Sequence, residues 1–397
     1  MIDFVTKTIN ALDQKYKTVG VFLDLQKAFD CLDHRILYTR LYNLGVRGVS
    51  LEWIKSYLTS RTQRVQVHNT LSDSLEVTFG IPQGSVLGPI LFILYTNSIT
   101  QTFPQLKLTM YADDISILFK NNSMENLEID SYLKLTNLYQ YLNSNNLHVN
   151  SNKTMCIHFS TLRNDEKNPL VYINDDALPC DNECKFLGLI LDRHFSWIPY
   201  IDSLCSKLSS QLFLLSIFAS YRNNVIIRLV YTSLIESRLR YGIALWGSAS
   251  QNALLRVFRL QKRAIRIMVG VNRQTSCRPF FKSLQILTLP ALYIYEIIIF
   301  HKLKSHNIIT GSDTHSYNTR HRHEHRQTTH RLQLAAVLPE NIGPKLFNKL
   351  PNYIRAENRK NTFKLLLKKL LLEGACYSVD EFLDLDLDLS PTTINGN

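Results

Sequence analysis

A four-residue motif, Tyr111-Ala112-Asp113-Asp114, constrains the fold of this chain more than any other stretch. Apolar residues alternate on both sides of it, which is typical of a β-hairpin with one buried face. The alternating residues are Leu106, Leu108 and Met110 before the motif and Ile115, Ile117 and Phe119 after it. Two adjacent carboxylates at the end of a buried hairpin disfavour each other's ionised forms, and a shared cation would relieve this repulsion. The sequence therefore predicts a hairpin tip that attracts a cation.

A third carboxylate, Asp24, interrupts an apolar run over 19–25 that we interpret as a central strand. A buried carboxylate needs a partner, and an Asp at a strand end paired to a Lys or Arg is one solution. If the strand and the hairpin share a sheet, Asp24, Asp113 and Asp114 converge at one edge. Hard oxygen ligands favour Mg²⁺ or Mn²⁺ over zinc, and two such ions support in-line displacement at phosphorus. This pattern alone fits a polymerase or a nuclease.

The remaining periodicity predicts a mixed α/β region followed by an all-helical one. We expect helices over 2–16, 27–44, 50–59, 124–143, 198–219, 223–240, 251–269 and 345–372. We expect strands over 65–67, 71–79, 147–150, 155–159, 170–173 and 186–191. Between them, a Gly- and Pro-rich loop runs from Gly80 to Phe92, and Pro89 suits the first turn of a helix that ends near Ile99. Gln83 is the polar side chain of this loop that we expect to face a ligand.

Most of the net charge of +12 lies in one segment. Residues 256–331 contain 14 Lys and Arg against 3 Asp and Glu, which accounts for +11. A basic segment beside a nearly neutral body indicates a polyanionic partner, although a solvated basic face is the alternative. Within the predicted 251–269 helix, apolar residues alternate with Arg256, Arg259, Lys262, Arg263 and Arg266.

The seven cysteines are scattered and odd in number, which favours a reducing, intracellular compartment without a disulfide-linked partner. Cys180 and Cys184 lie close together, but no second Cys or His pair follows at zinc-finger spacing. The longest apolar stretch, 286–300, is too short to span a bilayer. We interpret residues 311–330 as a flexible basic arm whose histidines 321, 323 and 325 could alternatively hold a metal. The acidic tail 380–388 is expected to be loosely ordered.

Three motifs occur in an order that resembles the reverse transcriptase family, in particular its non-LTR (LINE-type, jockey-like) retrotransposon branch. They are Phe22-Leu-Asp-Leu-Gln-Lys-Ala-Phe-Asp30, the Gly80–Pro89 loop and Tyr111-Ala-Asp-Asp114. The stretches Asn150-Ser-Asn-Lys-Thr154 and Phe186-Leu-Gly-Leu189 follow, and the later Tyr317-Asn-Thr-Arg320 and 343–350 fit more loosely. The resemblance implies an RNA-directed DNA polymerase that uses dNTPs, two Mg²⁺ or Mn²⁺ ions, an RNA template and a DNA primer.

The resemblance also implies roles for individual residues. Asp24 and Asp113 match the metal-bridging aspartates, and Asp114 matches a third, more peripheral carboxylate. The Leu25 carbonyl would be a further oxygen ligand of the metal, and Tyr111 would line the nucleotide-binding site.

Phe29 matches the bulky residue that excludes a ribose 2′-OH, a role compatible with a packed aromatic. Gln83 and Gly84 match the loop that holds the incoming nucleotide. Lys153 matches a residue that protonates the leaving pyrophosphate, with a surface lysine as the alternative. The primer-gripping hairpin would comprise Phe186, Leu187 and Gly188.

We expect a palm over 1–195 (an antiparallel sheet with packed helices), a helical thumb over 196–275 and a basic C-terminal extension over 276–397. The chain begins shortly before Asp24, so we expect an N-terminally truncated protein without fingers and endonuclease, with weak or no activity. The alternatives are a remnant that only binds nucleic acid, a metal-dependent nuclease and a maturase-type RNA chaperone.

Overall fold

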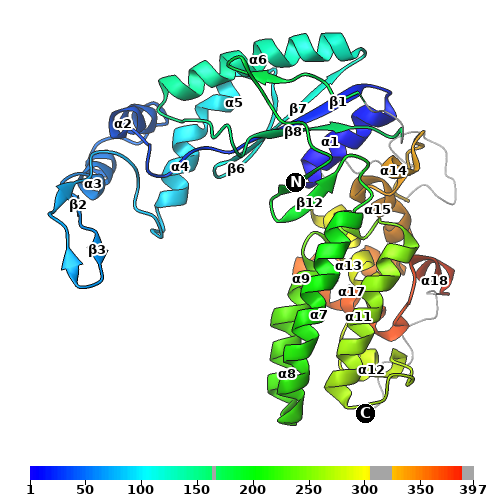
Figure 1. Cartoon of the computed structure of the whole chain (residues 1–397). Helices are drawn as coiled ribbons and strands as arrows, with labels where there is room; N and C mark the ends of the chain where they lie inside the picture. Colours follow the sequence, from blue (N-terminus) through cyan, green and yellow to red (C-terminus); the bar gives the residue numbers. More distant parts are fainter. Residues whose placement is uncertain (163–166, 305–323, 387–397) are drawn as a thin grey trace. The chain divides into compact units, whose positions relative to one another are not determined.

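The computed structural model describes residues 1–162, 167–304 and 324–386 and divides the chain into two compact units. Unit 1 comprises Met1–Gly188 with Asp192–His194, and unit 2 comprises Leu189–Leu191 with Phe195–Asn397. Figure 1 shows an antiparallel sheet with packed helices in unit 1 and helices throughout the described part of unit 2 beyond residue 197. The mixed α/β region followed by a helical one is thus confirmed.

The elements of unit 1 begin with α1 (Ile2–Asp13), β1 (Lys17–Leu23), α2 (His34–Asn43), α3 (Val49–Leu58), β2 (Thr62–Gln63), β3 (Gln66–Val67), β4 (Thr70–Leu71) and β5 (Leu75–Glu76). They continue with α4 (Gly88–Thr96), α5 (Ser98–Thr102), β6 (Lys107–Tyr111), β7 (Asp114–Asn121), α6 (Met124–Ser144), β8 (Met155–Phe159), β9 (Tyr172–Ile173), β10 (Asp176–Ala177) and β11 (Glu183–Phe186). The strand β12 (Leu189–Asp192) lies at the boundary between the units.

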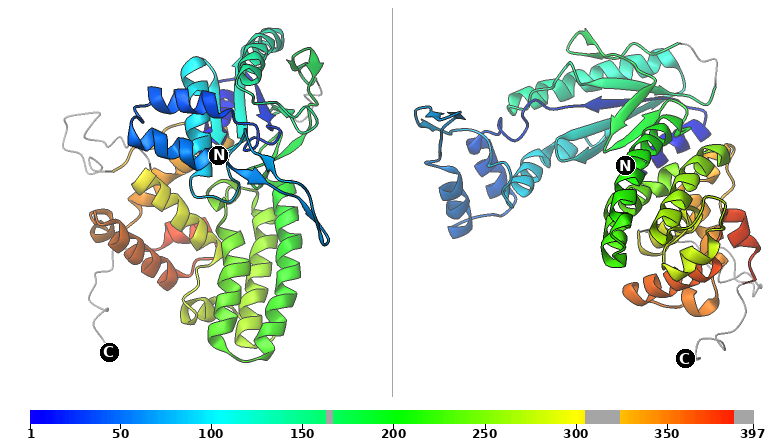
Figure 2. Two further views of the ribbon diagram at one scale, coloured as in Figure 1. Left: turned by 90° about the vertical axis from the view of Figure 1, so that its left-hand side faces the viewer. Right: turned by 60° about the horizontal axis from the view of Figure 1, so that its bottom comes forward.

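The central sheet has the order β6-β7-β1-β8, and every neighbouring pair is antiparallel. Strand β1 lies inside it, and its two faces contact different partners because successive side chains point to opposite faces. Val19, Val21 and Leu23 join the core that contains the leucines of α6. On the other face the Phe22 ring lies 5.4 Å from Phe4 of α1. Helices α6 and α1 therefore cover opposite faces (Figure 2).

Gly20 occupies a crowded place on the α1 face. A Cβ atom at this position would lie 2.8 Å from the Phe159 ring and 3.0 Å from the Phe4 ring. A side chain here would have to displace the Phe159 and Phe4 rings.

One structural difference concerns the predicted helix over 27–44. The 27–44 pattern suggests one helix, but α2 begins only at His34. Lys27 has a φ of 43°, which a continuous helix does not allow, and residues 26–30 form turns. The Asp33 carboxylate accepts hydrogen bonds from the N–H groups of Arg35 and Ile36 and so caps the start of α2. Phe29 consequently lies in a turn.

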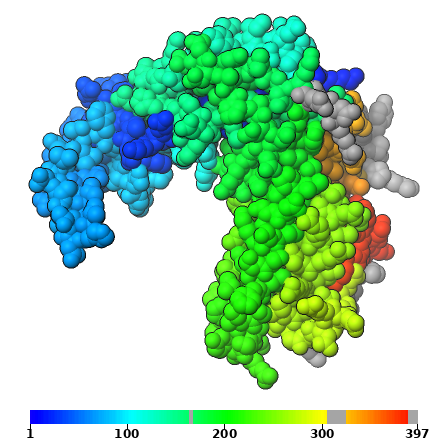
Figure 3. Space-filling view, in the orientation of Figure 1, coloured from blue at the N-terminus to red at the C-terminus, as the bar shows by residue number. Residues whose placement is uncertain are grey.

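Residues between α2 and α4 extend from the sheet as an arm, seen in blue in Figure 3. Its predicted strands are present but short, as the ribbons β2–β5 and β3–β4. Val67 and Leu75 in these ribbons are 61% and 72% exposed, so this arm has little core of its own.

The described elements of unit 2 are α7 (Ile198–Ser220), α8 (Asn224–Val230), the π-helical turn η1 (Tyr231–Glu236), α9 (Ser237–Arg240), α10 (Ile243–Trp246), α11 (Gln251–Val269), α12 (Arg278–Ser283), α13 (Leu289–Lys304), α14 (Gln333–Ala336), α15 (Pro339–Asn348), α16 (Asn352–Arg355), α17 (Lys360–Gly374) and α18 (Val379–Asp384). Helices α7 and α11 lie side by side (Figures 1 and 2). The predicted 345–372 helix is wrong as a single element, because Pro351 separates α15 from α16 and α17.

The apolar stretch near 286–300 becomes α13, a helix buried on nearly every side. Ile294, Ile297 and Ile298 are fully buried among the other helices. A helix that is apolar all round belongs in a core. None of the described helices combines the length and the apolar character needed to cross a membrane.

Two expectations concern the C-terminal region. The proposed basic arm falls largely on residues 305–323, including Tyr317–Arg320 and the histidines 321 and 323, which lie outside the described residues.

The start of the acidic tail is ordered, contrary to expectation. Residues 379–384 form α18, where Phe382 is buried and Glu381 pairs with Arg278 at 2.6 Å.

Candidate active site

The hairpin of β6 and β7 positions two of the three candidate carboxylates. Tyr111 pairs with Asp114 at the end of the ladder, which leaves Ala112 and Asp113 as the two turn residues. Ala112 has a φ of 51°, in the left-handed region that two-residue hairpin turns require. Tyr111 is 69% exposed, and Asp113 and Asp114 are half-buried. The hairpin is confirmed, with the aspartates at its tip.

Asp24 joins these residues through the register of the sheet. The β1–β7 ladder ends at the pair Leu23 and Ile115, so Asp24 and Asp114 are the next residues along the two strands. Residues opposite each other on antiparallel strands have Cβ atoms about 5 Å apart. Burial raises the pKa of Asp114, and the charges of Asp113 and Asp24 raise it further. The three carboxylates therefore repel one another at one edge of the sheet.

A turn between α6 and β8 holds Asp24 in place. Asn150 Nδ2 donates to Asp24 Oδ2 at 3.1 Å, and Lys153 Nζ lies 3.6 Å from the same oxygen. The backbone N–H of Asn150 also donates to the Asp24 carbonyl at 2.8 Å, and Leu25 forms a bridge with Val149. Asp24 follows β1, with a side chain that is 30% exposed, where a wholly buried strand position was expected.

The donor chemistry of this edge fits a hard divalent cation, because it consists of carboxylate oxygens whose mutual repulsion a cation would offset. In their present positions, no three His, Cys, Asp or Glu side chains of the described residues are grouped closely enough to hold a metal ion. Asp24 is instead engaged by Asn150 and Lys153.

The Gly-rich loop packs against the turn that follows Asp24. A Cβ at Gly80 would lie 2.8 Å from the Asp30 backbone, and the N–H of Ile81 donates to the Phe29 carbonyl at 2.8 Å. Gln83 Nε2 donates to Asp30 Oδ1 at 2.9 Å. The hydrogen bond with Asp30 thus holds Gln83 against the turn that follows Asp24.

Phe29 and Gly84 lie in the same region of unit 1. The Phe29 ring packs 4.8 Å from the Phe92 ring of α4, so it is a packed aromatic as anticipated. Gly84 has a φ of 77° and open space where a Cβ would be, so its backbone can be approached closely.

The predicted primer-gripping residues differ in exposure. Phe186 is 4% exposed and packs 5.1 Å from the Phe22 ring, so it anchors the turn to the sheet. Leu187 and Gly188 follow with φ angles of 46° and 79°, and Gly188 is exposed. Leu187 and Gly188 are therefore more accessible than Phe186.

The five basic residues of α11 in unit 2 have unequal surroundings. Arg256 pairs with Asp202 at 2.7 Å, Lys262 lies over the Phe258 ring, and Arg266 donates to the Thr275 carbonyl. Arg259 and Arg263 are exposed and have no carboxylate partner within the described ranges. These two are therefore the most available to a polyanion.

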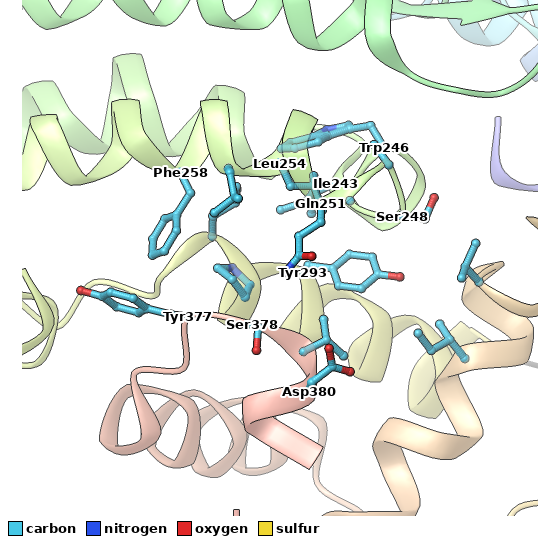
Figure 4. A pocket seen from close by; sticks show the side chains of 18 residues that line it. Ile243, Trp246, Ser248, Gln251, Leu254, Phe258, Tyr293, Tyr377, Ser378 and Asp380 are labelled. Carbon is cyan, nitrogen blue, oxygen red and sulfur yellow. The ribbon is translucent and has the colours of Figure 1, made fainter. Parts of the chain in front are cut away.

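Unit 2 also contains a pocket of about 330 Å³ beside α11 and α13 (Figure 4). Its lining is largely apolar and aromatic, with Trp246, Phe258 and Tyr293, and Asp380 is its single charged residue. A pocket with one carboxylate and no cation does not suit a phosphate ligand.

Sequence reasoning missed two residues that organise the site. Asn150, in the 150–154 motif, donates a hydrogen bond to Asp24, and Asp30 accepts one from Gln83. Asp30 ends the Phe22–Asp30 motif, and this position in the motif could have indicated its role. The contact of Asn150 joins positions 126 residues apart and has no local signature.

The antiparallel sheet, its packed helices and the aspartates across β1 and β7 define the class, a polymerase-type palm. Residues 3–191 match the family model described as reverse transcriptase (RNA-dependent DNA polymerase).

Curated relatives include two transposon proteins of Drosophila melanogaster. The probable RNA-directed DNA polymerase from transposon X-element is 23% identical over 87% of this chain and 36% of its own length. The RNA-directed DNA polymerase from mobile element jockey is 26% identical over 71% of this chain and 32% of its own length. The chain thus spans about a third of the length of these relatives.

Among solved structures, apo telomerase from Candida tropicalis aligns with a TM-score of 0.38 and 15% identity, over 74% of this chain and 50% of that one. A version truncated from its C-terminal domain gives a TM-score of 0.36 and 18% identity, over 48% and 38%.

Proposed function

We propose that this chain is the polymerase part of a non-LTR retrotransposon reverse transcriptase, which copies RNA into DNA from dNTPs on a primer 3′-OH. The observation that carries the proposal is the register that sets Asp24 opposite Asp114, with Asp113 at the adjoining turn. The family match over residues 3–191 supports the same activity.

Asp24, Asp113 and Asp114 would hold the divalent cations, Mg²⁺ or Mn²⁺. Cations bound there would supply neutralisation of the charge that develops during in-line displacement at phosphorus. The contacts of Asp24 with Asn150 and Lys153 both fall on Oδ2, so a cation bound to this oxygen would replace them. The Asn150 backbone still fixes the Asp24 carbonyl, so the main chain keeps its position.

Other residues of unit 1 would bind the substrates. Lys153, once released from Asp24, would donate a proton to the leaving pyrophosphate. Phe29, fixed against Phe92, would restrict the sugar of the nucleotide, and Gln83 and Gly84 would contact its base pair. We assign Leu25 and Tyr111 to the same nucleotide site.

We further propose that the palm covers 1–195, the thumb 196–275 and the extension 276–397. In the thumb, Arg259 and Arg263 would contact the phosphates of the template and primer. The turn at Leu187 and Gly188 would lie against the primer.

A primer-extension assay on poly(rA) with an oligo(dT) primer tests the activity. We expect weak Mg²⁺-dependent incorporation by the wild-type chain and loss to background in Asp113→Asn. Asp130→Asn is the matched control, because this carboxylate pairs with Lys134 on α6 and lies outside the site. Incorporation that survives Asp113→Asn would overturn the assignment of the site.

A binding measurement separates the polymerase from a nuclease. A polymerase site predicts that Mg²⁺ together with a dNTP raises the melting temperature of the wild type and not of Asp113→Asn. Degradation of the template without any effect of dNTPs would favour a nuclease using the same carboxylates.

A further inference from the structure

Two cysteines that are distant in the sequence face each other at the edge of the unit 1 sheet. The N–H of Cys156 in β8 donates to the Pro179 carbonyl at 2.9 Å, and the N–H of Asp181 donates to the Cys156 carbonyl at 3.0 Å. This exchange makes Cys156 and Cys180 the opposed residues of a parallel bridge. Adjacent strands lie about 4.8 Å apart, within the range of about 4.4–6.8 Å that disulfide-linked Cα atoms span.

The surroundings of the two thiols differ. Cys156 is fully buried, and its hydrogen bond with Cys180 and its burial raise its pKa. Cys180 is partly exposed, and the hydrogen bond from Cys156 lowers its pKa. The His158 N–H and the charge of Arg193 lower the pKa as well, against the opposite effects of burial and of the Asp181 charge. A partly exposed cysteine whose pKa is lowered is more reactive than a buried one whose pKa is raised.

The other cysteines have less suitable settings. Burial, followed by the charge of Asp114, raises the pKa of Cys184 to about 12, and burial raises that of Cys376 to about 11. Burial also raises the pKa of the partly exposed Cys31 and Cys205 and of the buried Cys277. Cys180 therefore combines access, a favoured thiolate and a neighbouring thiol.

We propose that Cys156 and Cys180 form a thiol pair that a hydroperoxide oxidises to an intramolecular disulfide. The Cys180 thiol first loses its proton to solvent, and the thiolate attacks the terminal O–H oxygen of the hydroperoxide. The O–O bond breaks, Cys180 becomes a sulfenic acid, and the alkoxide leaves and takes up a proton from solvent to form the alcohol. The Cys156 sulfur then attacks the Cys180 sulfur, the S–O bond breaks, and hydroxide leaves as water with the Cys156 proton. The two thiols lose two electrons, which reduce the hydroperoxide to alcohol and water.

The disulfide would act on the strand next to the candidate active site. Strand β8 begins directly after the turn of Asn150, Lys153 and Thr154, which contacts Asp24. Linking Cys156 to Cys180 would add a covalent bond between this strand and the segment 179–181, which main-chain hydrogen bonds of Cys156 already join.

The test uses the full chain, reduced and then treated with hydrogen peroxide. We expect the intact mass to fall by two hydrogens and a digest to contain a dithiothreitol-sensitive peptide pair joining Cys156 to Cys180. Cys180→Ser should abolish the pair, and Cys184→Ser, the nearest matched control, should leave it. In Cys156→Ser, dimedone should trap a sulfenic acid at Cys180.

Failure to find the 156–180 peptide pair in the oxidised wild type would overturn the proposal, as would faster modification of another cysteine. The wild-type digest decides the outcome even if a variant fails to fold. The assay reads sulfur chemistry alone, so its result is independent of polymerase activity.

Discussion

At the scale of single residues, the carboxylates of the candidate site destabilise the sheet on which they lie. Like charges on opposed strand positions destabilise an antiparallel pair, and Asp24 and Asp114 occupy such positions. Asn150 and Lys153 offset part of this cost by binding Asp24. The raised pKa of Asp114 shows that its charged form remains unfavourable in the folded protein.

Asp114→Asn should therefore stabilise the protein while it removes activity. A raised pKa means that folded Asp114 binds a proton more readily than the unfolded chain does. Its contribution to stability is therefore greatest below the unfolded pKa and is lost as the pH rises through the folded pKa. At pH 7 we expect the variant to melt about 2–4 °C higher than the wild type, with the difference vanishing in acid.

Calorimetry or circular dichroism across pH checks this expectation. Asp130→Asn serves as the control and should not raise the melting temperature, because it breaks a favourable pair with Lys134. A lower melting temperature for Asp114→Asn at pH 7 would show that the carboxylate is not repelled.

Lys153→Met should slow chemistry more than binding. If Lys153 protonates the leaving pyrophosphate, kcat falls by about 10²-fold, and the basic limb of the pH–rate profile changes. Lys185→Met, which alters an exposed lysine of β11, is the matched control. Steady-state primer extension measures both, and a raised KM with unchanged kcat would assign Lys153 to binding instead.

At the scale of elements, periodicity predicted most helices and strands, and side-chain-to-backbone contacts decided where they end. The 27–44 pattern continues through residues that form turns, because apolar spacing does not register the positive φ of Lys27. Asp33 directly before His34 is an N-cap signal that could have corrected the start of α2. The hairpin was predictable because both strands and the tip are contiguous in sequence.

The relation between elements was less predictable. The convergence of Asp24 on the tip follows from the β1–β7 register, which the sequence could suggest only by assuming a common sheet. The uneven availability of the α11 arginines depends on partners such as Asp202, 54 positions away from Arg256 in the sequence. Such contacts need the tertiary structure.

Helix α13 carries a pH-sensitive contact with the segment before α14. His301 Nε2 lies 2.7 Å from His325 Nδ1, and burial, followed by the charges of His325 and Lys302, lowers the pKa of His301 to about 4. Burial and the charges of Lys302 and Arg355 lower the pKa of His325 as well. Both imidazoles are thus held neutral near pH 7.

Acid should therefore weaken unit 2. The unfolded chain takes up a proton at His301 below about pH 6.5 and the folded chain only near pH 4, so the free energy of unfolding falls as the pH falls between these values. The loss for His301 is about 3 kcal/mol. His301→Gln should flatten this dependence in denaturant titrations, whereas His68→Gln, at an exposed position in unit 1, should not. An unchanged slope in His301→Gln would contradict the assignment.

At the scale of the whole molecule, the charge distribution predicts how the protein responds to salt. The basic residues concentrate in 256–331, and binding to a phosphate backbone weakens as salt rises because counterions are released. Arg259 and Arg263 are exposed cations of this segment.

We expect Arg259→Gln/Arg263→Gln to weaken binding to an RNA–DNA duplex and to reduce the slope of log K against log salt by about 1–2. Lys368→Gln/Lys369→Gln on α17 removes the same charge from exposed positions outside the 256–331 segment and is the control. Fluorescence anisotropy at several salt concentrations measures both. Equal effects of the two double variants would mean that net charge alone governs binding.

The place of β6 in the central sheet has a practical consequence for handling this protein. Among the described residues β6 pairs only with β7, so one row of its backbone donors and acceptors remains outside the ladder. Such edges recruit strands from other chains and promote aggregation unless charged side chains interrupt them. Lys107 is the one charged residue of β6, and it is exposed. Solubility during expression should therefore depend on Lys107, and a substitution there to valine should precipitate a protein that is otherwise correctly folded.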